Sequence, residues 1–454
     1  YGWVNEDDST LASDDSDWET ATYYMGSWED GSLKTGWQKI TVYDQDEDDD
    51  YDYWFNFKSN GKKRFNESDF KDILEKKING KHYAFDNRGV MTYEWTLTTT
   101  SDASTISNWL YFNSPEDGAR ATKGWFKVVA PDEDGDDNTF KDYSNDSANS
   151  TFAQGDAADE NERWYYADSD GELYVGQIKK IKGKYYGFAP EGNKAGSMLT
   201  GLCALTVNEK GEIETLWARD MDSDDLDDAL KAEGDFAATT SHGAFGASKY
   251  DTLYYFGNNE DSDGALKTGN VSVSLDGDSY QFQFSKTGGA EGKGRGVNGV
   301  DDGKYIYKFG MKVKADSDDK YIVVYADGDT GASDVTVHKI DTSVLRSAYS
   351  TEAGQNKDDD TVSYVGELVG NSTTNGKYYL VNTSGTIVKN KTSAKDGNDW
   401  YFYVDNKVIK MYTNNNTLTG GVEDLKKDWN VESKLISDGI AGDVLDTDMV
   451  DDGI

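Results

Sequence analysis

The chain has 454 residues, of which only 36% are hydrophobic. Its 30 Tyr, 17 Phe and 12 Trp therefore supply much of its apolar surface. A hydrophobic fraction this low argues against one large core and favours thin stacks of hairpins. The formal net charge of −39 repels phosphate backbones and anionic lipids, which argues against a nucleic-acid partner and against membrane insertion. The same charge would keep a secreted, aromatic-rich array soluble.

The chain opens at Tyr1-Gly2-Trp3, which looks like the middle of a repeat. Residues 1–21 are therefore interpreted as a partial repeat, and we expect a leader or further repeats to have been removed ahead of it, as in a processed extracellular protein. The single cysteine, Cys203, excludes an intrachain disulfide. No apolar run reaches the ~20 residues that a membrane-spanning helix needs.

Residues 22–100 form the first full repeat module. The module begins with Tyr23-Tyr24-Met25-Gly26, continues with the alternating strand Tyr53-Trp54-Phe55-Asn56-Phe57 and reaches a second aromatic strand in Gly80–Phe85. Alternation of aromatic with polar residues predicts strands with one buried and one solvated face. The acidic run from Asp44 to Asp52 lies between strands and is expected to form a long exposed hairpin loop.

Residues 101–204 form the second repeat module, in which the same kinds of motif recur in the same order. These motifs are Asn108–Phe112, Gly124-Trp125, Trp164-Tyr165-Tyr166 with Asp170-Gly171, and Gly183-Lys184-Tyr185-Tyr186-Gly187-Phe188. The acidic stretch from Pro131 to Asp142 is again expected to be an exposed hairpin loop. The spacing of about 20 residues within the module is typical of two short strands and two turns.

Residues 205–245 are interpreted as an insertion with a short helix. The helix is expected in Ser223–Ala232, where acidic residues occupy the first turn and Lys the last. The stretch from Ser68 to Lys76 in the first module has the same design, and it predicts a second short helix.

Residues 246–320 form a third module, which repeats the first module motif by motif from Tyr254-Tyr255-Phe256-Gly257 onward. Residues 321–419 form a fourth, degenerate module. The last segment, 420–454, is a non-repeat C-terminal tail. A fixed order of short motifs along a chain is the mark of a modular array, in which each unit buries its apolar face against its neighbours. We therefore predict an all-β fold, an array of aromatic β-hairpins similar to a β-solenoid, with two short helical insertions.

These motifs resemble the cell-wall-binding repeats of Gram-positive surface proteins, known as choline-binding or glucan-binding repeats. The resemblance rests on the Gly-Trp, Trp-Tyr-Tyr and Gly-Lys-Tyr-Tyr motifs and covers about 22–201, 252–312 and 376–410. It implies a β-hairpin solenoid, a location in the cell wall or on the cell surface, and a non-catalytic role. The implied partner is a cell-wall polymer or glycan.

The resemblance also indicates where a ligand would bind. In choline-binding members of the family a quaternary ammonium is held in a cage of aromatic side chains from successive hairpins. The candidate ligand-binding residues at matching positions are Trp37, Trp54, Trp109, Trp125, Trp164, Tyr166 and Tyr186. The alternative for each of these aromatics is core stacking between hairpins. Gly269-Asn270 and two other sites lack the Trp of the Gly-Trp signature, so complete cages are expected only in the first half.

Other chemistry has little support in the sequence. The three histidines show no metal-ligand spacing and none is near a nucleophile elbow, so we expect neither a catalytic residue nor an enzyme. No cofactor is expected, with calcium as the exception: Asn259, Asp261 and Asp263 place oxygen ligands at alternate positions before a Gly, as in an EF-hand loop. The alternative for this loop is a solvated turn.

Two functions follow from these patterns. The first is a non-catalytic extracellular cell-surface protein that binds wall polymer or glycan through aromatic hairpins. The alternative is a structural subunit of an extracellular filament or surface layer, assembled head to tail by self-association. In that case the apolar residues from Val422 to Ile436 would dock on the opening Tyr1–Val4 unit of a neighbouring copy, although the tail could equally cap its own chain.

Overall fold

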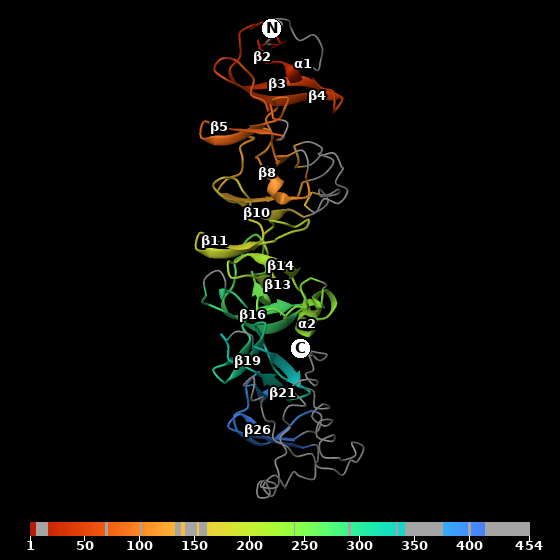
Figure 1. Ribbon diagram of the computed structural model, residues 1–454, viewed down its shortest axis with the longest axis vertical. Coiled ribbons are helices and arrows are strands. Elements are labelled where there is room, and N and C mark those ends of the chain that lie inside the picture. The colour runs from red at the N-terminus through yellow and green to blue at the C-terminus, as the bar shows by residue number, and fades with distance from the viewer. Residues whose placement is uncertain are drawn as a thin grey trace. The chain divides into compact units, whose positions relative to one another are not determined.

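Short antiparallel strands built on the alternating aromatic pattern make up most of the regular secondary structure (Figure 1). The computed structural model describes residues 1–5, 17–68, 71–99, 102–131, 138–140, 152–153, 161–239, 241–288, 292–332, 335–340, 376–397 and 401–413. The chain divides into two compact units. Unit 1 comprises Tyr1–Gln177 and Gly187–Met198, and unit 2 comprises Ile178–Tyr186 and Leu199–Ile454.

The elements are short and follow one another closely. Up to residue 188 they are β1 Trp3–Val4, α1 Asp17–Thr20, β2 Tyr23–Tyr24, β3 Gly36–Asp44, β4 Asp49–Phe57, β5 Leu74–Ile78, β6 Lys81–Phe85, β7 Trp95–Leu97, the 3₁₀ helix η1 Ile106–Asn108, β8 Trp109–Tyr111, β9 Gly124–Val128, β10 Arg163–Ala167, β11 Gln177–Ile181 and β12 Lys184–Phe188. From residue 202 they are β13 Leu202–Val207, β14 Ile213–Ala218, α2 Ser223–Lys231, the 3₁₀ helix η3 Gly234–Phe236, β15 Asp251–Tyr255, β16 Gly269–Leu275, β17 Asp278–Phe284, β18 Gly299–Asp301, β19 Tyr305–Lys308, β20 Met311–Lys312, β21 Tyr321–Ala326, β22 Val337–Ile340, β23 Lys377–Asn382, β24 Lys391–Lys395, β25 Tyr401–Asp405 and β26 Val408–Thr413.

Two-stranded hairpins are the rule among the strands up to β12. The pairs are β1 with β2, β3 with β4, β5 with β6, β7 with β8, β9 with β10 and β11 with β12. The aromatic strands predicted in Tyr53–Phe57, Trp164–Tyr166 and Tyr280–Phe284 all pair antiparallel with their neighbours. The strand predicted in Trp400–Tyr403 is formed as β25, Tyr401–Asp405, which also pairs antiparallel. The all-β hairpin array is therefore confirmed for the described residues, which also contain two short α-helices, α1 and α2.

Strands β3 and β4 pair along their whole length, so their connection is shorter than predicted. Only residues 45–48 join the two strands, and the prediction of a long exposed loop over Asp44 to Asp52 is wrong in its extent. Asp52 faces β3 and accepts a hydrogen bond from Thr41 Oγ1 at 2.6 Å. Asp44 is buried, with its carboxylate accepting from Tyr53 Oη at 2.8 Å.

The helix predicted between Ser68 and Lys76 is not formed. Residues 69–70 lie outside the described residues, and from Leu74 onward the chain is strand β5, paired with β6 through a two-residue turn at Asn79-Gly80. Both turn residues have positive φ, 50° and 88°, as a type I′ hairpin turn requires. Pairing with β6 satisfies backbone groups that a short helix would leave unpaired, and so it outweighs the local helical pattern.

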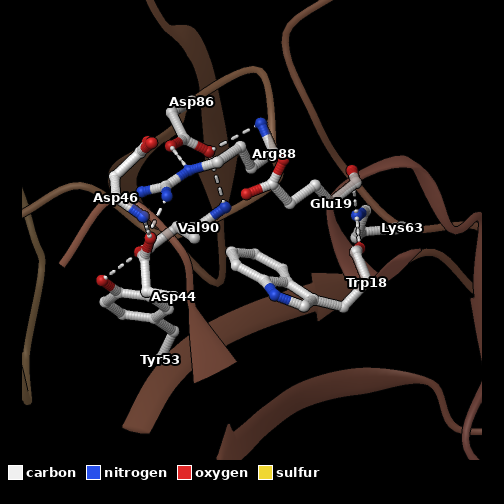
Figure 2. A network of polar contacts seen from close by, with 9 residues as sticks. All are labelled: Trp18, Glu19, Asp44, Asp46, Tyr53, Lys63, Asp86, Arg88 and Val90. Atoms are coloured by element: carbon white, nitrogen blue, oxygen red, sulfur yellow. Dashed lines mark hydrogen bonds and ion pairs between the residues drawn. The ribbon is translucent and has the colours of Figure 1, made fainter. Parts of the chain in front are cut away.

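A group of opposite charges is buried in unit 1 beside the β3–β4 hairpin (Figure 2). Arg88 contacts two carboxylates, with Nη1 2.8 Å from Asp44 and Nε 3.1 Å from Asp86. Both carboxylate side chains are only 1% exposed. Burial works against ionisation of Asp44, but hydrogen bonds and the Arg88 charge lower its pKa below the usual value.

Lys63 is a second buried cation in the same region (Figure 2). Its Nζ donates to the carbonyl oxygens of Trp18 at 2.8 Å and Glu19 at 2.9 Å, and it lies 5.3 Å from the ring centroid of Trp3. Burial lowers the pKa of Lys63 to about 7. The lysine thereby ties α1 to the aromatic core of the β3–β4 hairpin.

Unit 2 differs because its hairpins merge into larger sheets. The strand orders are β14-β13-β15, β16-β17-β20-β19-β18, β22-β21-β23 and β24-β25-β26. The buried faces of the first three sheets share one core with helix α2, which lies near β16 (Figure 1). The helix predicted in Ser223–Ala232 is confirmed as α2, and Asp222 caps it by accepting from the Asp225 backbone N–H at 2.9 Å.

Some predictions fall outside the described residues. These are most of the acidic stretch from Pro131 to Asp142, residue Trp400 and the whole tail 420–454. In the described part of the chain no helix is long and apolar enough to span a bilayer.

Candidate aromatic ligand sites

The first aromatic site, on hairpins β3–β4 and β5–β6 of unit 1, consists of Trp37, Trp54, Tyr83 and Phe85. The Trp37 ring centroid lies 6.5 Å from that of Trp54 with an interplanar angle of 83°, and 4.8 Å from that of Tyr83 at 62°. Phe85 is buried, with its centroid 5.7 Å from Trp37. The other three rings are half-buried. The site therefore offers two indoles at nearly a right angle, both partly open to solvent.

A carboxylate lies beside Trp54 in the first aromatic site. The indole Nε1 donates to Glu116 Oε2 at 3.1 Å, and Lys39 Nζ donates to Glu116 Oε1 at 2.7 Å. The pKa of Glu116 is lowered, first by the hydrogen bond from Lys39 and then by that from Trp54. The ionised carboxylate adds negative potential next to rings whose faces already attract cations.

The second aromatic site consists of Trp125, Trp164, Tyr166, Tyr174 and Phe188, all in unit 1. The Trp125 centroid lies 6.4 Å from that of Trp164 at 86°, and 5.1 Å from that of Tyr166 at 76°. Tyr174 stacks on Tyr166 at 5.2 Å, and the buried ring of Phe188 stacks on Trp125 at 5.7 Å. The indole pair thus has the geometry found in the first aromatic site.

The two sites occupy the same register positions in their hairpins. Lys39 of β3 pairs with Trp54 of β4, and Lys127 of β9 pairs with Trp164 of β10. In both hairpins the Trp of the Gly-Trp motif lies two residues before that lysine, so the indoles are diagonal cross-strand neighbours. One hairpin design therefore produces both indole pairs.

The two lysines at this register position have different partners. Lys127 Nζ lies 6.0 Å from the ring centroid of Trp164, which is the distance at which a cation is attracted to an indole face. Lys39 is held by Glu116 and lies 3.7 Å from Asp52. A lysine of the chain itself thus already lies over an indole face in the second site.

Hairpin β16–β17 of unit 2 lacks the indole pair. Its register places Asn270 and Gln281 where the first aromatic site has Trp37 and Trp54. Both amide side chains are exposed. The buried positions keep their aromatic character, as Phe282 and Phe284 are 1% exposed. The two amides in place of two indoles therefore remove the Trp pair from the surface and leave the core of the hairpin intact.

The remaining candidates are Trp109 of unit 1 and Tyr186 of unit 2. Trp109 is 2% exposed, belongs to a core cluster and donates its Nε1 to the Ala103 carbonyl at 3.0 Å. Trp109 is therefore a core residue, which is the alternative considered for each aromatic. Tyr186 is half-buried on β12 of unit 2. Tyr83 and Tyr174 were not among the predicted residues. The sequence could have indicated Tyr83, because Gly80-Lys81-His82-Tyr83 matches Gly183–Tyr186, which contains the predicted residue Tyr186.

The residues proposed for calcium make other contacts in the structure. The Asn259 side-chain oxygen accepts backbone N–H groups of Asp261 at 3.1 Å and Ser262 at 2.8 Å. Both carboxylate oxygens of Asp263 contact the Lys267 ammonium. These contacts favour the solvated-turn alternative, and calcium at this loop stays a prediction. In the described ranges no three His, Cys, Asp or Glu side chains are grouped to hold a metal ion.

No protein-family model matches the sequence, and no curated protein matches it. Solved structures give weak similarities. The modular autolysin LytC of Streptococcus pneumoniae, in complex with a synthetic peptidoglycan ligand, is 17% identical over 60% of this chain and 35% of the autolysin, with a TM-score of 0.25. Choline binding protein F of Streptococcus pneumoniae is 18% identical over 65% of this chain and 90% of that chain, with a TM-score of 0.23.

CbpJ of Streptococcus pneumoniae is similar too, at 14% identity over 82% of this chain and 100% of that chain, with a TM-score of 0.22. This chain therefore spans about a third of the autolysin and nearly all of the two other proteins. At these identities and TM-scores the similarities assign neither a family nor a ligand to the chain.

Proposed function

We propose that this protein is a non-catalytic extracellular binding protein of the cell wall or cell surface, and that its two aromatic sites grip a cationic group on a wall polymer. The observation that supports this proposal is the duplication of the near-perpendicular indole pair at one register position of β3–β4 and β9–β10. Core packing explains the buried aromatics of these hairpins, but it does not require a half-buried Trp pair on the opposite strand face.

The geometry favours a compact cation over the flat face of a sugar ring. Indole planes at 83° and 86° form two walls of a corner, and a third ring, Tyr83 or Tyr166, adds another wall. A rounded quaternary ammonium touches several walls of such a corner at once, and each ring face attracts it. A sugar ring stacks on one flat aromatic face at a time.

The residues of each site have separate roles in this proposal. The indole pair supplies the attractive faces, and Phe85 and Phe188 fix the orientation of Trp37 and Trp125 from the buried side. Glu116 strengthens the first site because its ionised carboxylate lies next to Trp54. The net charge of −39 draws cations toward the whole surface.

Choline is the first ligand to test, and intrinsic Trp fluorescence reports on both indole pairs. We expect saturable binding of choline, and we expect Trp37→Ala and Trp125→Ala each to weaken binding at their own site by about 0.5–2 kcal/mol, the contribution of one cation–π contact. Soluble wall glycans are titrated in parallel, because a glycan that competes with choline would identify the polymer.

Two controls make this experiment specific. Trp28→Ala removes an exposed indole that contacts Tyr1 and belongs to neither site, so choline affinity should stay unchanged. The neutral carbon isostere of choline has the shape without the charge, so it should bind more weakly. Absence of a saturable change with choline and with every wall glycan would reject the proposal.

The filament alternative finds no supporting contact among the described residues. Trp3, the aromatic of the opening unit, is already packed, with ring centroids 4.9 Å from Tyr24 and 5.1 Å from Phe55. Strand β1 pairs with β2 of the same chain. The tail that would dock there lies outside the described residues, so light scattering of the intact protein is the direct test of self-association.

A further inference from the structure

A cavity of about 800 Å³ lies within unit 2, whereas both aromatic sites belong to unit 1. Its lining includes the cationic residues Lys249, Arg295 and Lys308, the imidazole of His338 and the rings of Phe245 and Phe309. This volume is within the range of pockets that enclose small organic molecules. A cationic lining stands out in a chain with a net charge of −39.

Lys308 is the most unusual group in this lining. The residue is 9% exposed, its Nζ donates to the Leu230 carbonyl at 2.8 Å, and it lies 5.8 Å from the ring centroid of Phe309. Among the described residues it has no carboxylate partner. Burying an ammonium without a counter-charge is costly, and burial lowers the pKa of Lys308 to about 8.

A purely structural role accounts for part of this arrangement. Leu230 lies in the last turn of α2, so the Lys308 ammonium satisfies a carbonyl at the negative end of the helix. That contact uses one of three N–H donors. Two donors of a buried cation therefore remain for another partner.

His338 is next to this cation and also has bonding capacity to spare. Its Nδ1 is buried and has no hydrogen-bond partner in the described structure. Burial, followed by the nearby Lys308 charge, lowers the pKa of His338 to about 4. The imidazole is thus neutral at physiological pH, and Nδ1 is free to donate or accept according to its tautomer.

The two acidic residues in the lining are already bonded. Glu209 accepts from Tyr250 Oη at 2.8 Å. Asp251 accepts from Thr206 Oγ1 at 2.8 Å and from two backbone N–H groups, those of Gly246 and Ser248, at 3.0 Å each. Neither carboxylate contacts Lys308 in the part of the chain that the structure describes. The lining holds four cationic side chains, those of Lys231, Lys249, Arg295 and Lys308, against these two carboxylates, so its net charge is positive.

We propose that this cavity binds a sugar-sized molecule that carries an oxyanion, either a carboxylate or a phosphate. The anion is the missing counter-charge of the Lys308 ammonium, and His338 Nδ1 donates to the same group. The rings of Phe245 and Phe309, whose centroids are 4.9 Å apart, form an apolar wall for the body of the ligand. This site shares no residue with the aromatic sites, and its ligand has the opposite charge.

Calorimetric titration of the intact chain tests the proposal with three matched probes. Glucuronate carries a carboxylate, glucose 6-phosphate carries a phosphate, and glucose carries no charge. We expect one or both anions to bind and glucose to bind at least about tenfold more weakly, which is the contribution of a hydrogen bond to a charged group. Comparison of the two anions shows which oxyanion is preferred.

Lys308→Gln removes the charge but keeps an N–H donor for the Leu230 carbonyl, and it should weaken binding of the anion about tenfold or more. The matched control Lys314→Gln changes an exposed lysine of unit 2 outside the lining, and it should leave affinity unchanged. Should Lys308→Gln fail to fold, Ala332→Trp fills the exposed rim of the cavity without touching Lys308 and should abolish binding. Equal binding of glucose and the anions, no binding of either anion, or full affinity in both cavity variants would each overturn the proposal.

Discussion

Arg88, Lys63 and Lys308 are all withdrawn from solvent, and each has a different compensation for its charge. Arg88 has two carboxylates, Lys63 has two carbonyls with two aromatic rings nearby, and Lys308 has one carbonyl and one ring. The desolvation cost of a cation is offset well by a carboxylate and less well by neutral dipoles. Arg88 is therefore part of a structural ion group in unit 1, whereas Lys308 of unit 2 has no counter-charge among the described residues.

Arg88→Met should destabilise unit 1 by about 3 kcal/mol, because two carboxylates that are 1% exposed lose their shared cation. Met keeps much of the side-chain volume, so the effect reports on charge. Denaturant unfolding followed by Trp fluorescence measures it. The control Lys81→Met breaks an ion pair with Asp117 whose side chains are 59% and 42% exposed, and it should change stability far less. Similar losses in both variants would contradict the structural role of Arg88.

At the scale of elements, three hairpins share one register but differ in their exposed surface. The buried face is aromatic in β4, β10 and β17, which is why alternation along the sequence was enough to predict these strands. The exposed face holds Trp pairs in the first two hairpins and amides in the third. Loss of the Gly-Trp signature at Gly269-Asn270 predicted this difference from the sequence alone.

Other features at this scale were not predictable from local patterns. The charges of Ser68 to Lys76 are typical of a helix, yet Asn79-Gly80 supplies a hairpin turn that recruits Leu74–Ile78 into a strand. Asp44 begins an acidic run that looks solvated, and only its approach to Arg88 and Tyr53 explains why it is buried. Tyr83 joins Trp37 from a separate hairpin, so no spacing within one hairpin reveals it.

Lys127→Ala should raise the affinity of the second aromatic site for choline two- to fivefold, which corresponds to about 0.5–1 kcal/mol for an exposed cation–π contact. The reason is that the Lys127 ammonium lies over the Trp164 face that the ligand would use. Measuring the variant in a Trp37→Ala background isolates the second site. Unchanged or weaker binding would show that the ligand does not use this face.

At the scale of the whole molecule, the sequence predicted the hairpin array but not how its hairpins join. In unit 2 strand β17 pairs with β20 through a single residue pair, Phe282 with Met311, and this contact helps to extend a hairpin into a five-stranded sheet. Such a pairing depends on chain segments far apart in sequence and leaves no periodic signal. In unit 2 three of the merged sheets share one core with α2, whereas unit 1 has several smaller aromatic clusters.

The charge of −39 gives the last prediction, which concerns salt. Self-repulsion among 85 acidic and only 46 basic residues opposes the folded state, and salt screens it. The melting temperature of the intact protein should therefore rise between 50 and 500 mM sodium chloride, concentrations that shorten the screening length from about 14 Å to about 4 Å.

Choline binding should respond to salt in the opposite direction, because the same negative field that destabilises the fold concentrates cations near the aromatic sites. Its affinity should fall with salt, whereas the neutral carbon isostere, which feels only the ring faces and the corner between them, should keep its affinity. If choline and its isostere were to respond alike, the field of the molecule would have no part in recognition, and the aromatic corners alone would account for binding.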